Sequence, residues 1–132
     1  MQTKLAFFHR PAIKFIRRAQ LVIATLIYCV LLLLPSRSLQ ETVSLNDALL
    51  HGVGNFLLFC SLWLAFDAKP SRLFWLAFTI AFSGFMELMQ GLGSRSPSWS
   101  DLGANAAGAF VALLVCTALD YYFSHLSNKK CA

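Results

Sequence analysis

Four long apolar stretches constrain the fold of this chain more than any other feature of its sequence. They cover residues 19–34, 53–66, 73–89 and 102–123. A helix that crosses a bilayer needs about 20 mostly apolar residues, and the second stretch reaches that length only if its helix begins near Asp47. Charged residues make up 13% of the chain, against roughly 25% in soluble domains. We therefore expect an all-α fold, a four-transmembrane-helix bundle.

Basic residues are unevenly distributed among the segments that flank these stretches. Nine lie before the first stretch, between the second and third, or after the fourth, whereas only Arg37 and Arg95 lie in the other two connections. Because Lys and Arg are retained on the cytoplasmic side of membrane spans, this distribution predicts that both termini are cytoplasmic. The net charge of +5 is then mainly a topology signal. A nucleic-acid partner is not expected, since no binding motif accompanies the basic residues.

The chain divides into three parts on this interpretation. Residues 1–18 form a basic N-terminal segment with interleaved apolar residues, which is typical of a stretch lying at the membrane interface. A segment that only stops translocation is the alternative for this part. Residues 19–123 form the four-helix membrane domain, and residues 124–132 form a cytoplasmic tail.

Eight polar or charged residues stand out because the predicted orientation places all of them at the outer ends of the helices or in the loop that joins two of them. They are Asp47, His51, Asn55, Glu87, Gln90, Arg95, Asp101 and Asn105. Residues three or four apart share one face of a helix, so the spacing within each helix directs these side chains the same way. We expect one polar site facing the outer leaflet.

Simpler structural roles are open for several of these residues. Asp47 follows Ser44, and Asp101 follows Ser98, by the three residues of a capping box. Asn55 and Asn105 could be interhelical hydrogen-bond partners. His51 and Glu87 cap no helix, and an unpaired charge inside a membrane costs several kcal/mol, on the order of 3 for a carboxylate. A purely structural Glu87–Arg95 ion pair is the alternative for the glutamate.

These residues carry a resemblance to a known family. The order of Asp47, His51, Glu87, Gln90, Arg95, Asp101, Asn105 and Gly108 resembles the VanZ-like family of small polytopic bacterial membrane proteins. The similarity spans about residues 46–112, with Ala48 where relatives often carry a basic residue and Ala112 where a second glycine is frequent. The resemblance implies a multi-pass protein of the bacterial cytoplasmic (inner) membrane. It also implies a link to the cell envelope and to resistance against the glycopeptide teicoplanin, and a distant similarity to enzymes that process lipid head groups.

The residues themselves suggest chemistry on a lipid-linked phosphorylated head group, of a phospholipid or an undecaprenyl-type lipid. His51, Glu87 and Asp101 are the candidate catalytic residues, as acid, base, nucleophile or orienting group. Arg95 is the candidate phosphate ligand, because its planar guanidinium matches phosphate oxygens. Further substrate-binding candidates are Gln90, Asn105, Asn55 and Asp47.

Several functional alternatives stay open at this point. The reaction would be a phosphoester hydrolysis or transfer without a cofactor, although His51, Glu87 and Asp101 could hold a divalent metal. Membrane lipids are the expected partners, and a second copy of the chain or an envelope-synthesis protein is a candidate partner too. The alternative functions are a non-catalytic module that binds or shields the head group and a small proton-coupled transporter.

Overall fold

The computed structural model describes residues 11–33, 47–66, 71–92 and 98–129. These residues form four α-helices: α2 is Pro11–Leu33, α4 is Asp47–Ala65, α5 is Arg72–Gly91 and α6 is Trp99–Lys129. The described part of the chain is therefore all-α, as predicted. Each helix contains one of the four apolar stretches, or nearly all of it.

Two of the helices continue beyond their apolar stretches. The described part of helix α2 starts at Pro11, ahead of its apolar stretch at residues 19–34. Helix α6 runs to Lys129, through a segment without Gly or Pro. Helix α5 keeps close to its apolar stretch, because the Ser71 hydroxyl accepts a hydrogen bond from the Phe74 N–H at 3.2 Å and caps its start. Helices α2 and α6 thus extend past the apolar stretches that predicted them, whereas a capping serine marks the start of α5.

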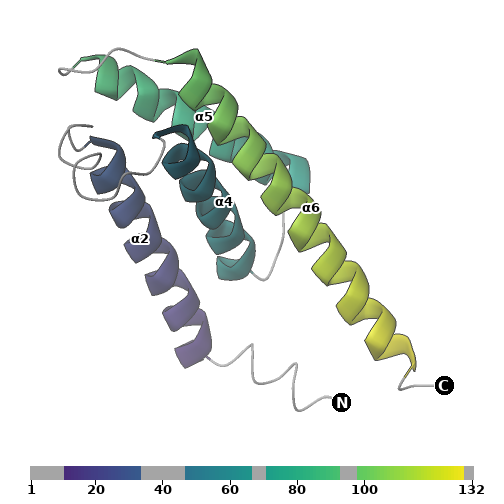
Figure 1. The fold of residues 1–132 in the computed structure, drawn as a ribbon. Helices are drawn as coiled ribbons and strands as arrows, with labels where there is room; N and C mark the ends of the chain where they lie inside the picture. The colour runs from purple at the N-terminus through teal and green to yellow at the C-terminus, as the bar shows by residue number, and fades with distance from the viewer. Residues whose placement is uncertain (1–10, 34–46, 67–70, 93–97, 130–132) are drawn as a thin grey trace.

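The helices alternate in direction along the molecule (Figure 1). The beginning of α2 and the end of α6 lie at one end, which we call the basic end. The beginning of α4, the end of α5 and the beginning of α6 lie at the opposite end, which we call the site end. The three helix tips predicted to carry the polar residues are therefore neighbours.

Helix α4 is central and packs against each of the other three, most extensively against α6. The two backbones meet at a pair of glycines: a Cβ added to Gly108 would lie 2.0 Å from the Gly52 carbonyl oxygen. Ala109 and Ala112, further along α6, are fully buried. Small residues therefore let α4 and α6 approach closely, which is how helices commonly associate in membranes.

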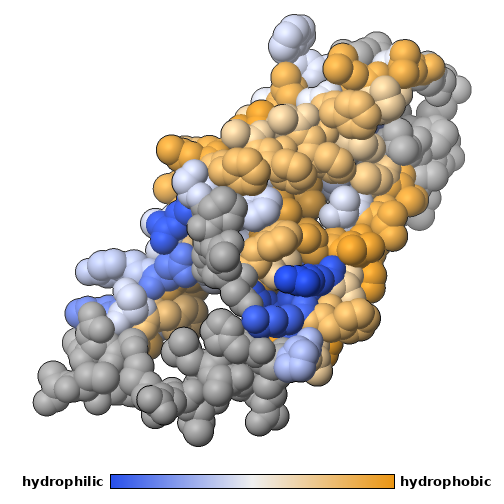
Figure 2. All heavy atoms as spheres, turned by 180° about the vertical axis from the view of Figure 1, so that it is seen from behind, coloured by the Kyte–Doolittle hydropathy of each residue, from blue (hydrophilic) through white to orange (hydrophobic). Residues whose placement is uncertain are grey.

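Polarity is inverted relative to a soluble protein. Among the described residues, the buried set is almost as often polar as apolar, whereas large apolar side chains such as Leu26 and Leu88 are at least 60% exposed. Figure 2 shows hydrophobic side chains over most of the described surface on one face, with strongly hydrophilic ones gathered towards the basic end. Within the described parts of the chain, three helices are long and apolar enough to cross a membrane, namely Asp47–Ala65, Arg72–Gly91 and Trp99–Leu126. Lipid is the solvent that this surface matches.

A small polar cluster joins three helices towards the basic end. Arg72 of α5 forms an ion pair with Asp120 of α6 at 3.0 Å and donates to the Thr117 hydroxyl at 3.2 Å. The Trp63 indole N–H of α4 donates to the same Asp120 oxygen at 3.3 Å. Tyr121 and Tyr122, exposed just beyond it, are residue types enriched where a helix leaves the bilayer.

Candidate functional site

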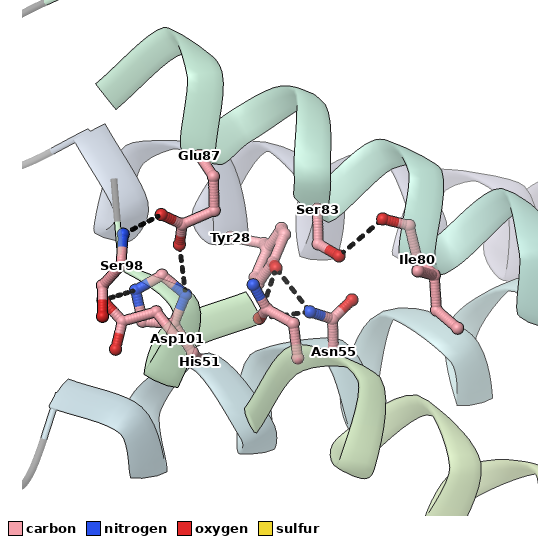
Figure 3. Close-up of polar contacts among 9 residues, drawn as sticks. Tyr28, His51, Asn55, Ile80, Ser83, Glu87, Ser98 and Asp101 are labelled. Atoms are coloured by element: carbon pink, nitrogen blue, oxygen red, sulfur yellow. Dashed lines mark hydrogen bonds and ion pairs between the residues drawn. The ribbon is translucent and has the colours of Figure 1, made fainter. Parts of the chain in front are cut away.

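The site end brings together one titratable side chain from each of three helices. The Nδ1 atom of His51 (α4) lies 3.4 Å from Glu87 Oε1 (α5), and its Nε2 atom lies 3.7 Å from Asp101 Oδ2 (α6). Figure 3 shows the imidazole ring between the two carboxylates. His51 is 1% exposed, and both carboxylates are also buried. The predicted convergence of these three residues is therefore present in the structure.

Helical spacing explains why these groups meet. Asp47, His51 and Asn55 follow one another at intervals of four in α4, and Asp101 and Asn105 do so in α6, so each set lies along one helix face. Those two faces pack against each other, because Gly52 and Gly108 allow close approach of the backbones. Asp47, which is half-buried, offers a carboxylate oxygen within 4.8 Å of ligand atoms of both His51 and Asp101.

A second polar layer lies next to the first along α4 and α6. The Asn55 amide donates to the Tyr28 hydroxyl at 2.9 Å and to Asn105 Oδ1, and the Tyr28 hydroxyl donates to Asn105 Oδ1 at 3.4 Å. The interhelical hydrogen bond considered as an alternative for the two asparagines is thus present. Tyr28 of α2 was not among the sequence candidates, because one tyrosine in an apolar stretch gives no signal of its partners.

The end of α5 and the beginning of α6 complete the surroundings of Glu87. Gln90 lies one turn after Glu87 and is buried. The Ser98 backbone N–H, just before the start of α6, donates a hydrogen bond to Glu87 Oε2 at 3.4 Å. Arg95, the predicted phosphate ligand, lies outside the described residues, as does Ser44 of the first capping box.

The buried core of the site is under-satisfied in hydrogen bonds. Among the described residues, both ring nitrogens of His51 and Oε1 of Glu87 are buried without a hydrogen-bond partner. Leaving a buried polar atom unpaired costs about 1–3 kcal/mol, so such atoms are rare and call for an explanation. Function is a common explanation, since a ligand or a reacting group then supplies the missing partner.

A pocket leads to Glu87 from the outside of the bundle. It has a volume of about 240 Å³ and is lined by Gly84, Glu87, Leu88, Ser98, Trp99 and Leu102. Among the described residues of this lining Glu87 is the one with an ionisable side chain, and its neighbours Leu88 and Trp99 are strongly exposed. The walls of the pocket are therefore mostly apolar, and its polar floor is the carboxylate that contacts His51.

Comparison with known proteins identifies the family. The VanZ/LLP1 family profile matches residues 5–120, which include the four helices up to Asp120 and all eight candidate residues. The chain belongs to the VanZ/LLP1 family. The region of this VanZ/LLP1 protein that the profile matches includes His51, Glu87 and Asp101. No curated protein and no solved structure matches the chain.

Proposed function

We propose that this VanZ/LLP1 protein is a membrane enzyme that hydrolyses or transfers the phosphorylated head group of a lipid. One observation carries the proposal: Glu87 is a buried carboxylate at the floor of a pocket with apolar walls, and His51 and Asp101 stand behind it. A lipid chain can follow Leu88 and Leu102 while its head group reaches Glu87. A water-soluble substrate has no need of such walls.

The chemistry assigned to the site is general acid–base catalysis. Glu87 takes the proton of the attacking water or hydroxyl as the oxygen of that nucleophile bonds to phosphorus. The bond from phosphorus to the leaving oxygen then breaks, its electron pair stays on the leaving oxygen, and that oxygen takes the proton from Glu87. His51 places its Nδ1 at 3.4 Å from Glu87, where an N–H orients the carboxylate and stabilises its charge. Asp101 Oδ2 lies 3.7 Å from Nε2, on the other side of the His51 ring, and orients the imidazole. In this proposal His51 and Asp101 act through Glu87, because neither lines the pocket.

Phosphate binding is assigned to Arg95 on sequence grounds. This residue occurs in the connection between α5 and α6. Gln90, before that connection, lies one helical turn after Glu87, and Ser98, after it, donates a backbone hydrogen bond to Glu87. A guanidinium matches two phosphate oxygens and stays charged at all relevant pH values. Gln90 is a neutral hydrogen-bonding group on the same helix face as Glu87. Asn55 and Asn105 support the site from the second polar layer.

We further propose that the site end faces the outer leaflet of the bacterial cytoplasmic membrane, with four spans and both termini inside. The distribution of Lys and Arg supports this orientation. A reporter that is active only in the cytoplasm, fused after Lys130, is expected to be active. The same reporter inserted in the connection between α5 and α6 is expected to be silent, and the reverse pattern would assign the site to the inner leaflet.

The proposed activity can be tested with purified protein in vesicles. We expect wild-type protein to release water-soluble phosphate or head group from vesicles of bacterial phospholipid that contain a polyprenyl diphosphate. Phosphorus NMR of the lipids before and after incubation identifies which species changes. Binding of a lipid without any turnover would instead support the head-group binding module. Unchanged lipids together with no binding would refute both functions.

A further inference from the structure

We infer that Asp47, His51 and Asp101 form a binding site for one divalent metal ion. Each of these residues offers a ligand atom, and all three atoms lie within 4.8 Å of one another. They come from the first two turns of α4 and the first turn of α6, the two helices held together by the Gly52–Gly108 contact. The ligands are therefore carried by rigid elements rather than by a loop.

The hydrogen-bond pattern of His51 points to a cation at this place. Nδ1 faces Glu87 Oε1 and Nε2 faces Asp101 Oδ2, yet neither nitrogen makes a hydrogen bond within the described part of the chain. A neutral imidazole has a single N–H. If that hydrogen is on Nδ1, the lone pair of Nε2 points towards a carboxylate oxygen 3.7 Å away. Two acceptors that face each other in a buried site need a proton or a metal ion between them.

The distances suit a metal ion in that position. Bonds from Zn²⁺ to His nitrogen and carboxylate oxygen are about 2.0–2.2 Å, so two ligand atoms on one ion lie roughly 3–4 Å apart. The 3.7 Å between His51 Nε2 and Asp101 Oδ2 falls inside that range. The carboxylate of Asp47, which is half-buried at the start of α4, offers the third ligand oxygen within 4.8 Å of the other two ligand atoms.

Glu87 then takes the role of the outer partner of the histidine. Metal-binding histidines almost always donate their second N–H to a carboxylate or carbonyl, which fixes the tautomer and the ring orientation. Glu87 Oε1, 3.4 Å from Nδ1 and buried without a hydrogen-bond partner among the described residues, is placed for this. One imidazole with two carboxylates suits Mn²⁺ or Zn²⁺ better than a soft ion such as Cu(I).

The ion adds to the proposed function without depending on it. A divalent cation next to Glu87 would attract a phosphorylated head group and leave open ligand positions for its oxygens. Binding of the ion is measured without lipid substrate and without turnover. A failure of the metal site and a failure of the lipid chemistry are therefore separate results.

The test uses Mn²⁺ and the full-length protein in a maltoside detergent after removal of metals with a chelator. We expect the electron paramagnetic resonance signal of hydrated Mn²⁺ to fall until one ion is bound per chain. Asp101→Asn, Asp47→Asn and His51→Gln are each expected to weaken binding at least ten-fold. Asp120→Asn removes a carboxylate from the same helix as Asp101, near the basic end, and is expected to bind Mn²⁺ like the wild type.

A spectroscopic measurement on the wild type guards against variants that fail to fold. Pulsed electron paramagnetic resonance detects a histidine nitrogen bonded to Mn²⁺, and we expect this nitrogen signal in the wild type. Its absence, or unchanged affinity in all three site variants, would overturn the metal site. Absence of Mn²⁺ binding in the wild type would do the same.

Discussion

Gly108→Ala is expected to separate α4 from α6 and to destabilise the protein by about 1–3 kcal/mol. The new methyl group would lie 2.0 Å from the Gly52 carbonyl oxygen, and a backbone atom cannot turn away as the end of a side chain can. The helices must therefore move apart along their most extensive contact. A loss of about 2 kcal/mol lowers the melting temperature of a domain of this size by roughly 5–10 °C. The measurement is the melting temperature of the purified protein in detergent, determined from the folded fraction that size-exclusion chromatography recovers after heating.

Two other glycines provide matched controls for this substitution. A Cβ at Gly52 would lie 3.3 Å from the Ala104 carbonyl oxygen, which requires only a small adjustment, and a Cβ at Gly103 would meet nothing within 4 Å. The expected order of destabilisation is therefore Gly108→Ala, then Gly52→Ala, then Gly103→Ala, with the last close to wild type. Equal melting temperatures for the Gly108 and Gly103 variants would show that α4 and α6 do not meet at this point.

Glu87→Gln is expected to reduce the proposed turnover of lipid by at least about 100-fold, in line with the loss of a general acid or base. Glutamine has nearly the same shape and can still accept the hydrogen bond from the Ser98 N–H. It cannot take up a proton from an attacking nucleophile. We therefore expect the variant to insert, accumulate and unfold at a temperature close to that of the wild type. The measurement is the rate of head-group release in the vesicle assay.

Asp120→Asn is the control for the change from carboxylate to amide. Asp120 contacts Arg72 and Trp63 near the basic end, away from Glu87, so its variant is expected to retain turnover even if it is somewhat less stable. Glu87→Asp keeps the carboxylate but shortens the side chain, and we expect an intermediate rate. Full activity of Glu87→Gln would remove Glu87 from the chemistry and with it the observation on which the proposed function rests.

The sequence could predict the helices and the meeting of His51, Glu87 and Asp101. Apolar stretches of nearly spanning length give the helices, and the positive-inside rule together with four-residue spacing places the three side chains at neighbouring helix tips. Helix ends were less predictable: α2 begins at Pro11 and α6 ends at Lys129, beyond the apolar stretches at residues 19 and 123. Hydropathy reports which residues prefer lipid, whereas a helix can continue through polar residues on either side of them.

Features that depend on pairing between distant residues could not be read from the sequence. Nothing in the sequence connects Tyr28 with Asn55 and Asn105, because the pairing arises only when α2 packs against α4. Gly103 and Gly108 look alike in the sequence, and only the structure shows that a Cβ added to Gly108 would collide with α4 whereas one added to Gly103 would meet nothing within 4 Å. The pocket beside Glu87 likewise results from the packing of α5 against α6.

The apolar walls of that pocket set a condition for any inhibitor directed at Glu87. On the proposed function, a compound that enters past Leu88 and Leu102 arrives from within the bilayer, so its potency would follow its concentration in lipid rather than its concentration in water. A polar mimic of a head group, however well it matches the carboxylate, would need an attached hydrocarbon tail. Potency should accordingly rise with tail length until the compound is retained by the membrane as firmly as a native lipid.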